Sequence, residues 1–336
     1  MSRLGRFMVT PALLRRLALA SLAANVVIVV TGGAVRLTGS GLGCPTWPKC
    51  TDASYMTTRA MGVHGVIEYS NRMLGGVVGL IAIAALLAAV WLRPRRPALV
   101  GLAALVLAGV VGQGVLGGIT VLTGLNPWTV AAHFLVSAGV IAAAYALWRR
   151  VDEADGAARP VVPGPLRALV WLLAAAAAAV LVLGTLVTGS GPHAGDPDTP
   201  RMGFDLTTIA QAHADVVFLL IGVSVATWFA LRAVGAPPGA VRAAGALVGI
   251  ELAQGLVGFV QYFMHVPPLA VGLHMLGACL VWLATLTLLY ATRVREPLAA
   301  GPPTAVSAHS AGSSGGPSSG EVAAPVTEPE ATLRVP

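Results

Sequence analysis

The chain has 336 residues and a net charge of +7, and 56% of its residues are hydrophobic whereas only 10% are charged. Its mean hydropathy of +0.79 excludes an ordinary water-soluble enzyme or binding domain. The composition predicts an all-α protein that crosses a membrane several times.

Eight apolar stretches are long enough to cross a bilayer, which takes roughly 20 residues per helix. In chain order they cover residues 17–35, 64–92, 98–122, 128–147, 166–188, 208–231, 241–263 and 269–291. Each is predicted to form a transmembrane helix. We expect the first to be retained, because no small-residue cleavage site follows it and seven further spans come after.

The distribution of basic residues predicts the orientation of the protein in the membrane. Arginines precede the first span and fill alternate connections, whereas the opposite connections contain only Arg36, Lys49, Arg59 and Arg201. Because Lys and Arg near helix ends are retained in the cytoplasm, we predict a multi-pass protein of the cell membrane, surrounded by lipid, with both termini cytoplasmic. This sidedness accounts for the positive charge, so no nucleic-acid partner is expected.

The sequence contains an internal duplication. Gln113 to His133 and Gln254 to His274 are matching segments 141 residues apart, and each opens with Gln-Gly and ends with a histidine twenty residues on. Thr38-Gly39-Ser40-Gly41 likewise recurs as Thr188-Gly189-Ser190-Gly191. Because each half contains an even number of crossings, we predict two tandem four-helix bundles related by a parallel repeat.

This duplication divides the chain into three regions. Residues 1–150 are predicted to form the N-terminal four-helix half, and residues 160–295 the C-terminal half. Residues 296–336 are mostly Ser, Gly, Pro and Ala. Such a composition cannot bury enough apolar surface to fold, so it predicts a disordered cytoplasmic tail.

Two histidines of the second half, His213 and His274, are predicted at the same depth near the outer ends of two helices. Two imidazoles at one level in a bundle are placed to ligate a haem iron from both faces, whereas they would make a poor zinc site. The alternative interpretation is that these histidines, as polar residues near helix ends, only contact interfacial water. A pair within a duplicated membrane unit instead favours a functional role.

The first half carries His133 in the place of His274, but Asn71 stands where the second half has His213. His64 precedes Asn71 by two helical turns on the same face. It is a candidate haem-binding residue, and the alternatives are an interfacial residue or a proton carrier.

Glu68 lies on the same helix face, between His64 and Asn71. A carboxylate at this position is predicted to face the first cofactor site, where it would accept a proton or stabilise a developing cation. The alternative is an ion pair with Arg72, four residues on.

Cys44 and Cys50 lie in the first outer connection, where oxidising conditions favour a disulfide. The sequence leaves open whether such a bond shapes the loop or takes part in redox chemistry.

Several of these motifs together resemble the haem A synthase family, membrane enzymes that oxidise a methyl group of haem O to the formyl group of haem A. They are Gly33 to Gly41, the Cys44 to Cys50 loop, Glu68 to Arg72, Gly117 to Val121 and the histidines at 133, 213 and 274. The resemblance implies a resident haem b held by His213 and His274, and a haem O substrate in the first half with His133. It assigns the catalytic carboxylate to Glu68. The family has a histidine at the position of Asn71.

The resemblance also implies a reaction course and partners. Successive hydroxylation would convert the methyl group to a geminal diol, which loses water to form the aldehyde needed by cytochrome oxidase. A haem O synthase and an electron acceptor are the expected partners. The identity of the acceptor, the oxygen source and association into a homo-oligomer stay open.

The main alternative is a dihaem b-type electron-transfer cytochrome. It explains the histidines equally well, but not the divergence in which Glu68 and Asn71 of one half correspond to Ala210 and His213 of the other. A transporter is a second alternative. It predicts polar groups at the membrane midplane, whereas the conspicuous polar residues cluster at the outer helix ends.

Overall fold

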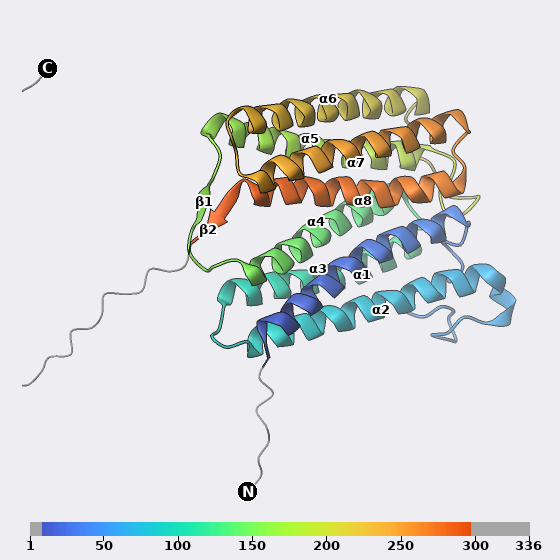
Figure 1. Ribbon diagram of the computed structural model, residues 1–336. Coiled ribbons are helices and arrows are strands. Elements are labelled where there is room, and N and C mark those ends of the chain that lie inside the picture. The colour runs from blue at the N-terminus through green and yellow to red at the C-terminus, as the bar shows by residue number, and fades with distance from the viewer. Residues whose placement is uncertain (1–8, 297–336) are drawn as a thin grey trace, which may run out of the picture. The chain divides into compact units, whose positions relative to one another are not determined.

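Eight long helices make up most of residues 9–296, the part of the chain that the computed structural model describes (Figure 1). They are α1 Pro11–Leu37, α2 Gly62–Trp91, α3 Pro97–Leu122, α4 Pro127–Asp152, α5 Gly164–Ser190, α6 Leu206–Ala233, α7 Pro238–Phe263 and α8 Pro268–Ala291. All eight are long and apolar enough to cross a membrane, which confirms the predicted spans. Each helix begins before its predicted span, because the helical backbone extends beyond the apolar window.

Local sequence signals account for the helix starts. Proline occupies the first turn of α1, α3, α4, α5, α7 and α8, where its missing N–H is not needed and its fixed φ suits the helix. Thr10, Asn126 and Asp205 cap α1, α4 and α6 by accepting a hydrogen bond from a backbone N–H of the first turn. Hydrogen bonds from Thr208 hold the pKa of Asp205 below its usual value, so this cap stays charged at neutral pH.

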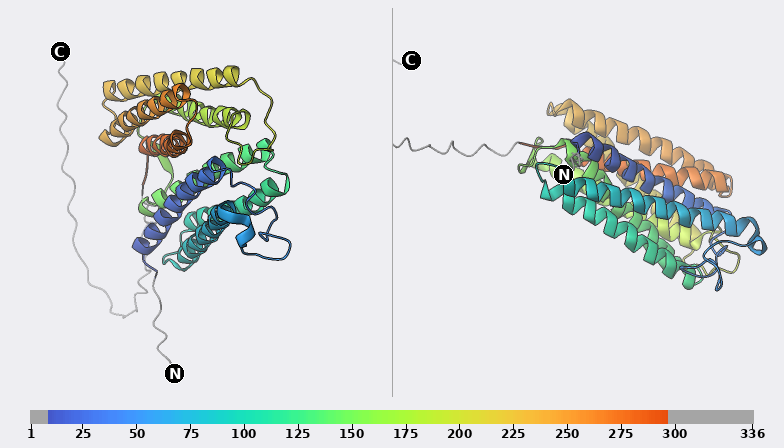
Figure 2. Two further views of the ribbon diagram at one scale, coloured as in Figure 1. Left: turned by 90° about the vertical axis from the view of Figure 1, so that its right-hand side faces the viewer. Right: turned by 90° about the horizontal axis from the view of Figure 1, so that it is seen from below.

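The helices form two groups of four. In the first group α1 contacts α2, α2 contacts α3, α3 contacts α4, and α4 closes on α1. The helices α5 to α8 make the same cycle of contacts. Figures 1 and 2 show the two groups side by side, joined through contacts of α1 and α4 with α8 and of α4 with α5. This arrangement agrees with two four-helix bundles, whereas the repeat relation between them stays a prediction.

Aliphatic residues, mainly Leu, Val and Ala, fill the core of each group and the boundary between them. One cluster of buried side chains lies within each half, and a third includes residues of both, such as Ile141 of α4 and Cys279 of α8. Hydrogen bonds between helical residues also cross the boundary: Tyr145 Oη donates to Thr287 Oγ1 at 2.9 Å, and Trp282 Nε1 donates to the Ala138 carbonyl at 3.0 Å. The two halves therefore form one packed body.

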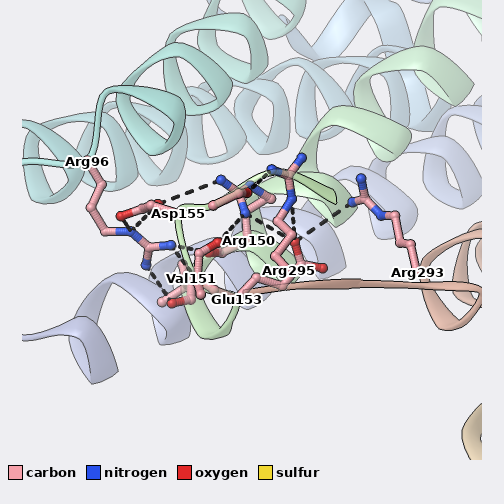
Figure 3. A network of polar contacts seen from close by, with 9 residues as sticks. Arg96, Arg150, Val151, Glu153, Asp155, Arg293 and Arg295 are labelled. Carbon is pink, nitrogen blue, oxygen red and sulfur yellow. Dashed lines mark hydrogen bonds and ion pairs between the residues drawn. The ribbon is translucent and has the colours of Figure 1, made fainter. Parts of the chain in front are cut away.

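An ionic network joins the halves at the end of the molecule where α1 begins and α8 ends, here called the terminal end (Figure 3). The carboxylate of Glu153 lies 3.2 Å from Arg150, 3.4 Å from Arg295 and 3.8 Å from Arg293. Arg96, just before α3, contacts Asp155 at 2.9 Å. The network thus connects chain segments that follow α2, α4 and α8.

A short two-stranded ladder lies beside this network, in which β1 (Ala158–Pro160) pairs antiparallel with β2 (Arg293–Arg295). The sequence did not indicate it, because neither segment has a strand pattern and each is ordered by the other. Beyond it, Glu296 contacts Arg159 at 3.3 Å. The remainder of the predicted disordered tail lies outside the described residues.

Replacing Glu153 with Ala should destabilise the protein, because it leaves the nearly buried Arg150 with fewer partners. We expect the free energy of unfolding to fall by about 1–3 kcal/mol, measured as a lower midpoint of thermal unfolding in detergent. The control is Asp152→Ala, which removes an exposed ion pair with Arg15 and should cost about 0–1 kcal/mol. Equal effects of the two substitutions would contradict a structural role for the network.

Candidate functional site

Three histidines lie at the opposite end of the helices from the terminal network, here called the loop end. His133, His213 and His274 are each seven or eight residues into α4, α6 and α8. Each ring packs closely on a glycine of the preceding helix. A Cβ atom added to Gly117 would lie 3.4 Å from His133 Cε1. One added to Gly184 would lie 3.3 Å from His213 Cε1, and one added to Gly258 would lie 3.4 Å from His274 Cε1. A larger residue at these glycines would displace the rings.

A glutamine orders the backbone at two of these histidines. Gln113 Nε2 donates to the His133 carbonyl at 2.8 Å, and Gln254 Nε2 donates to the His274 carbonyl at 2.8 Å. In both halves the glutamine stands four residues before the glycine that supports the ring, so both residues lie on one helix face. The duplicated sequence therefore forms the same local arrangement twice.

All three histidines leave the same ring nitrogen without a partner. Each side chain is half-buried, and its Nδ1 is buried without a hydrogen-bond partner within residues 9–296. The Val180 backbone lies beside the His213 ring, at a geometry that falls short of a hydrogen bond to Nδ1. The accessible part of each ring therefore includes Nε2, which is the nitrogen free to bind a ligand or a metal.

His213 and His274 lie on helices that face each other diagonally, since α6 and α8 each contact both α5 and α7. Their imidazoles are close enough to interact electrostatically. Two imidazoles without a partner among the described residues, on diagonal helices of one bundle, are side chains that could hold a haem iron. The donor set thus suits the group predicted for this half.

The corresponding diagonal of the first half runs from His133 on α4 to Asn71 on α2. The Oδ1 atom of Asn71 accepts a hydrogen bond from Thr31 Oγ1 of α1 at 2.8 Å. This side chain is therefore tied to α1, and the first half presents one imidazole where the second half presents two.

His64 is placed differently from the other histidines. Its side chain is exposed at the start of α2, and its Nδ1 lies 2.9 Å from Ser40 Oγ. It lines a cleft of about 330 Å³ together with loop residues that include Gly43, Pro45 and Asp196. His64 is therefore at the mouth of the first half rather than beside Asn71.

Glu68 is buried and forms the ion pair with Arg72 that the sequence offered as one interpretation. Its Oε1 accepts from the Arg72 guanidinium, and its Oε2 accepts from the backbone N–H of Cys44. The carboxylate is thus oriented by both α2 and the outer loop. An ion pair and a catalytic role are compatible, because a positioned carboxylate is what proton transfer requires.

Arg72 also organises the outer loop. Its guanidinium donates to the carbonyls of Cys44, Thr46 and Lys49 at 2.8, 2.9 and 3.1 Å. A disulfide joins Cys44 and Cys50, as the sequence predicted. Trp47 of the same loop lies against α3 at Gly118, where a Cβ would come within 2.5 Å of its ring. The loop therefore covers the end of the first bundle.

Sequence reasoning missed several of these contacts. Gln113 and Gln254 were noted only as repeat markers, and the supporting glycines received no role. Gly117 and Gly258 are 141 residues apart, like the two glutamines, so the repeat itself was the signal that could have found them. A buried carboxylate on α7, Glu251, was also missed.

These features define a multi-pass membrane protein with histidine sites at the loop end of two helical bundles. The family COX15-CtaA, described as cytochrome oxidase assembly proteins, matches residues 15–286. The chain belongs to this family.

Similar proteins agree with this assignment. A protein named "Heme A synthase" from Methylobacterium radiotolerans is 30% identical over 83% of this chain and 90% of its own length. Another of that name from Methylobacterium sp. strain 4-46 is 28% identical over 76% of this chain and 85% of its own. A third, from Alkalihalophilus pseudofirmus, is 36% identical over 41% of this chain and 46% of its own.

Replacing Arg72 with Met should loosen the outer loop, because it removes donors to three loop carbonyls. Losing even one hydrogen bond of about 1.5 kcal/mol should accelerate amide exchange across Cys44 to Cys50 by about tenfold or more. The control is Arg201→Met, since Arg201 donates to the Thr199 and Pro192 carbonyls of another loop. Exchange in the Cys44 to Cys50 loop should not change in this control, and unchanged exchange in Arg72→Met would contradict the role.

Proposed function

We propose that this protein is a haem A synthase, which oxidises one methyl group of haem O to a formyl group by successive hydroxylation and so supplies haem A for cytochrome oxidase. The family, and relatives named "Heme A synthase" that match most of the chain, support this function. The structural observation that carries it is the divergence of two similar half-sites. One has a pair of histidines, and the other has one histidine on α4 and a buried glutamate on α2.

The resident haem b is assigned to the second half. His213 and His274 would hold it through their accessible Nε2 atoms, while Gly184 and Gly258 leave room for the two rings. The iron of a bound haem b supplies one-electron redox chemistry. Gln254 fixes the backbone of His274 and so keeps this imidazole in position.

The haem O substrate is assigned to the first half, with His133 as the protein ligand of its iron. Asn71 supplies no imidazole and is held by Thr31, so this substrate would have one histidine ligand. Glu68 would accept a proton during oxidation of the methyl group or stabilise positive charge on the substrate. His64 would contact the substrate at the mouth of the cleft.

The membrane orientation is part of the proposal. The loop end would face the outside of the cell membrane and the terminal end the cytoplasm, in keeping with the arginine-rich terminal end. A disulfide between Cys44 and Cys50 supports this orientation, since such bonds persist outside the reducing cytoplasm. A haem O synthase would supply the substrate, and a separate acceptor would remove the electrons.

Extraction and chromatography of the haems from protein expressed with a source of haem O test the two half-sites. Wild-type protein should contain haem b together with haem O, an oxidised intermediate or haem A. His213→Ala and His274→Ala should each lose the haem b, because each removes one of the two side chains that would hold its iron. Two equivalents of haem b with no modified haem would instead identify an electron-transfer cytochrome, and haem b retained by both variants would overturn the second-half site.

Replacing Glu68 with Ala should abolish haem A formation while leaving the second-half haem b bound. Proton transfer by a positioned group contributes about 10²- to 10⁴-fold, so we expect at least a hundredfold lower yield of haem A per bound haem b. Asp152→Asn, at the exposed terminal end, is the control and should retain full conversion. Undiminished haem A in Glu68→Ala would remove this residue from the mechanism.

A further inference from the structure

A carboxylic acid is buried inside the second bundle at mid-length of α7. Glu251 is 3% exposed, and its Oε1 accepts a hydrogen bond of 2.8 Å from Ser224 Oγ of α6. Its Oε2 is buried and has no hydrogen-bond partner within the described residues. The side chain is therefore only half satisfied, in a part of the fold that the proposed catalytic residues do not reach.

The surroundings of Glu251 are apolar. Leu247, one turn away on α7, and Leu220, one turn from Ser224 on α6, both belong to the buried core of this half. The helices packed against α7 are α6 and α8. Their titratable groups, together with those of α7 itself, are His213, Asp215, Arg232, His274, Cys279, Tyr290, Arg242 and Tyr262. None of these forms a hydrogen bond or ion pair with Glu251 among residues 9–296.

An ionised carboxylate is costly in such a place, because the surroundings are apolar and the described residues supply no counter-ion. A neutral acid fits the observed contacts better. Its carbonyl oxygen accepts from Ser224, and its other oxygen carries a proton. Glu251 is thus expected to be neutral unless a positive charge within the bundle compensates its negative charge.

Glu251 lies on the helix face that leads to the histidine site. Gln254 and Gly258 follow it at three and seven residues, so all three share one stripe of α7. Gln254 binds the His274 carbonyl, and Gly258 supports the His274 ring. The distance along α7 from Glu251 to Gly258 is about 10 Å at 1.5 Å per residue.

The acid is specific to the second half. At the corresponding positions of the first half, 141 and 142 residues earlier, Val110 replaces Glu251 and Ala82 replaces Ser224. Both of these residues belong to an apolar cluster. The acid and its hydroxyl donor therefore occur together, and only in the half that carries two histidines.

We propose that Glu251 is a redox-linked proton-binding site, which binds a proton when the group held by His213 and His274 is reduced and releases it when that group is oxidised. The inference rests on the proposed function, whose oxidation of haem O supplies the electrons. For each electron that enters the bundle, one proton from water forms an O–H bond at Oε2, and the charge of the bundle stays constant. At low dielectric such compensation is strongly favoured over an isolated added charge.

Reduced-minus-oxidised infrared difference spectra of the full-length, haem-loaded protein test this directly. Wild-type protein should show a carboxylic-acid carbonyl band that shifts to lower frequency in D₂O. Glu251→Gln should remove this band, and Glu68→Gln, in the other half, should retain it. Ser224→Ala should move the band to higher frequency, because the carbonyl oxygen loses its donor. The visible spectrum of each variant establishes that haem b is bound.

The midpoint potential of the bound haem provides a second readout. In wild-type protein it should change with pH by up to about 59 mV for each tenfold change in proton activity, and Glu251→Gln should flatten this dependence. No carboxylic-acid band, or a band and pH dependence that Glu251→Gln leaves unchanged, would overturn the proposal. If Glu251→Gln does not fold, a carboxylic-acid infrared band that keeps its wild-type frequency in Ser224→Ala overturns the proposal. Failure of the proposed function is separate, since it would appear in the chromatography of the extracted haems as two equivalents of haem b with no modified haem.

Discussion

The low polarity of the membrane interior is the constraint on which this structure depends. A polar group buried there needs a partner, so the backbone is helical throughout the spans and the few polar side chains bind specific neighbours. Asn71 is held by Thr31 and Glu68 by Arg72, while Gln254 binds the carbonyl of a histidine. The same interactions that satisfy these groups also orient them, so stability and site geometry have one physical origin.

The two halves share a helical scaffold but differ in the polar side chains that they place in it. Both halves retain the glutamine, the glycine and the histidine that follow one another on α3 and α4 and on α7 and α8. The first half adds a carboxylate beside the outer loop at Glu68. The second half adds one at mid-length of α7 at Glu251, beneath its histidine pair. The position of the acid along the bundle therefore distinguishes the two sites, in addition to the Asn71 that takes the place of a histidine in the first half.

Connections at both ends hold the halves in register. At the loop end, Arg36 donates to the Thr188 carbonyl at 2.6 Å, and the Gly41 N–H donates to the Gly195 carbonyl at 2.9 Å. These residues lie in or beside the repeated Thr-Gly-Ser-Gly segments, so the two copies of one motif meet in space. At the terminal end the strand ladder and the Glu153 network make the corresponding link. The disulfide loop is anchored to this frame through Arg72.

The sequence by itself determined the eight spans, the duplication, the histidine positions and the family resemblance. The thickness of the bilayer sets the length and composition of the spans, and the period of the helix sets the spacing of residues on one face. Both can be recognised in short stretches of sequence. Only the tertiary structure decided that Glu68 is oriented by Cys44 and Arg72, and that Ser224 reaches Glu251 across 27 residues of chain. It also decided that β1 pairs with β2. Such contacts join residues distant in sequence, and their geometry exists only once the helices have packed.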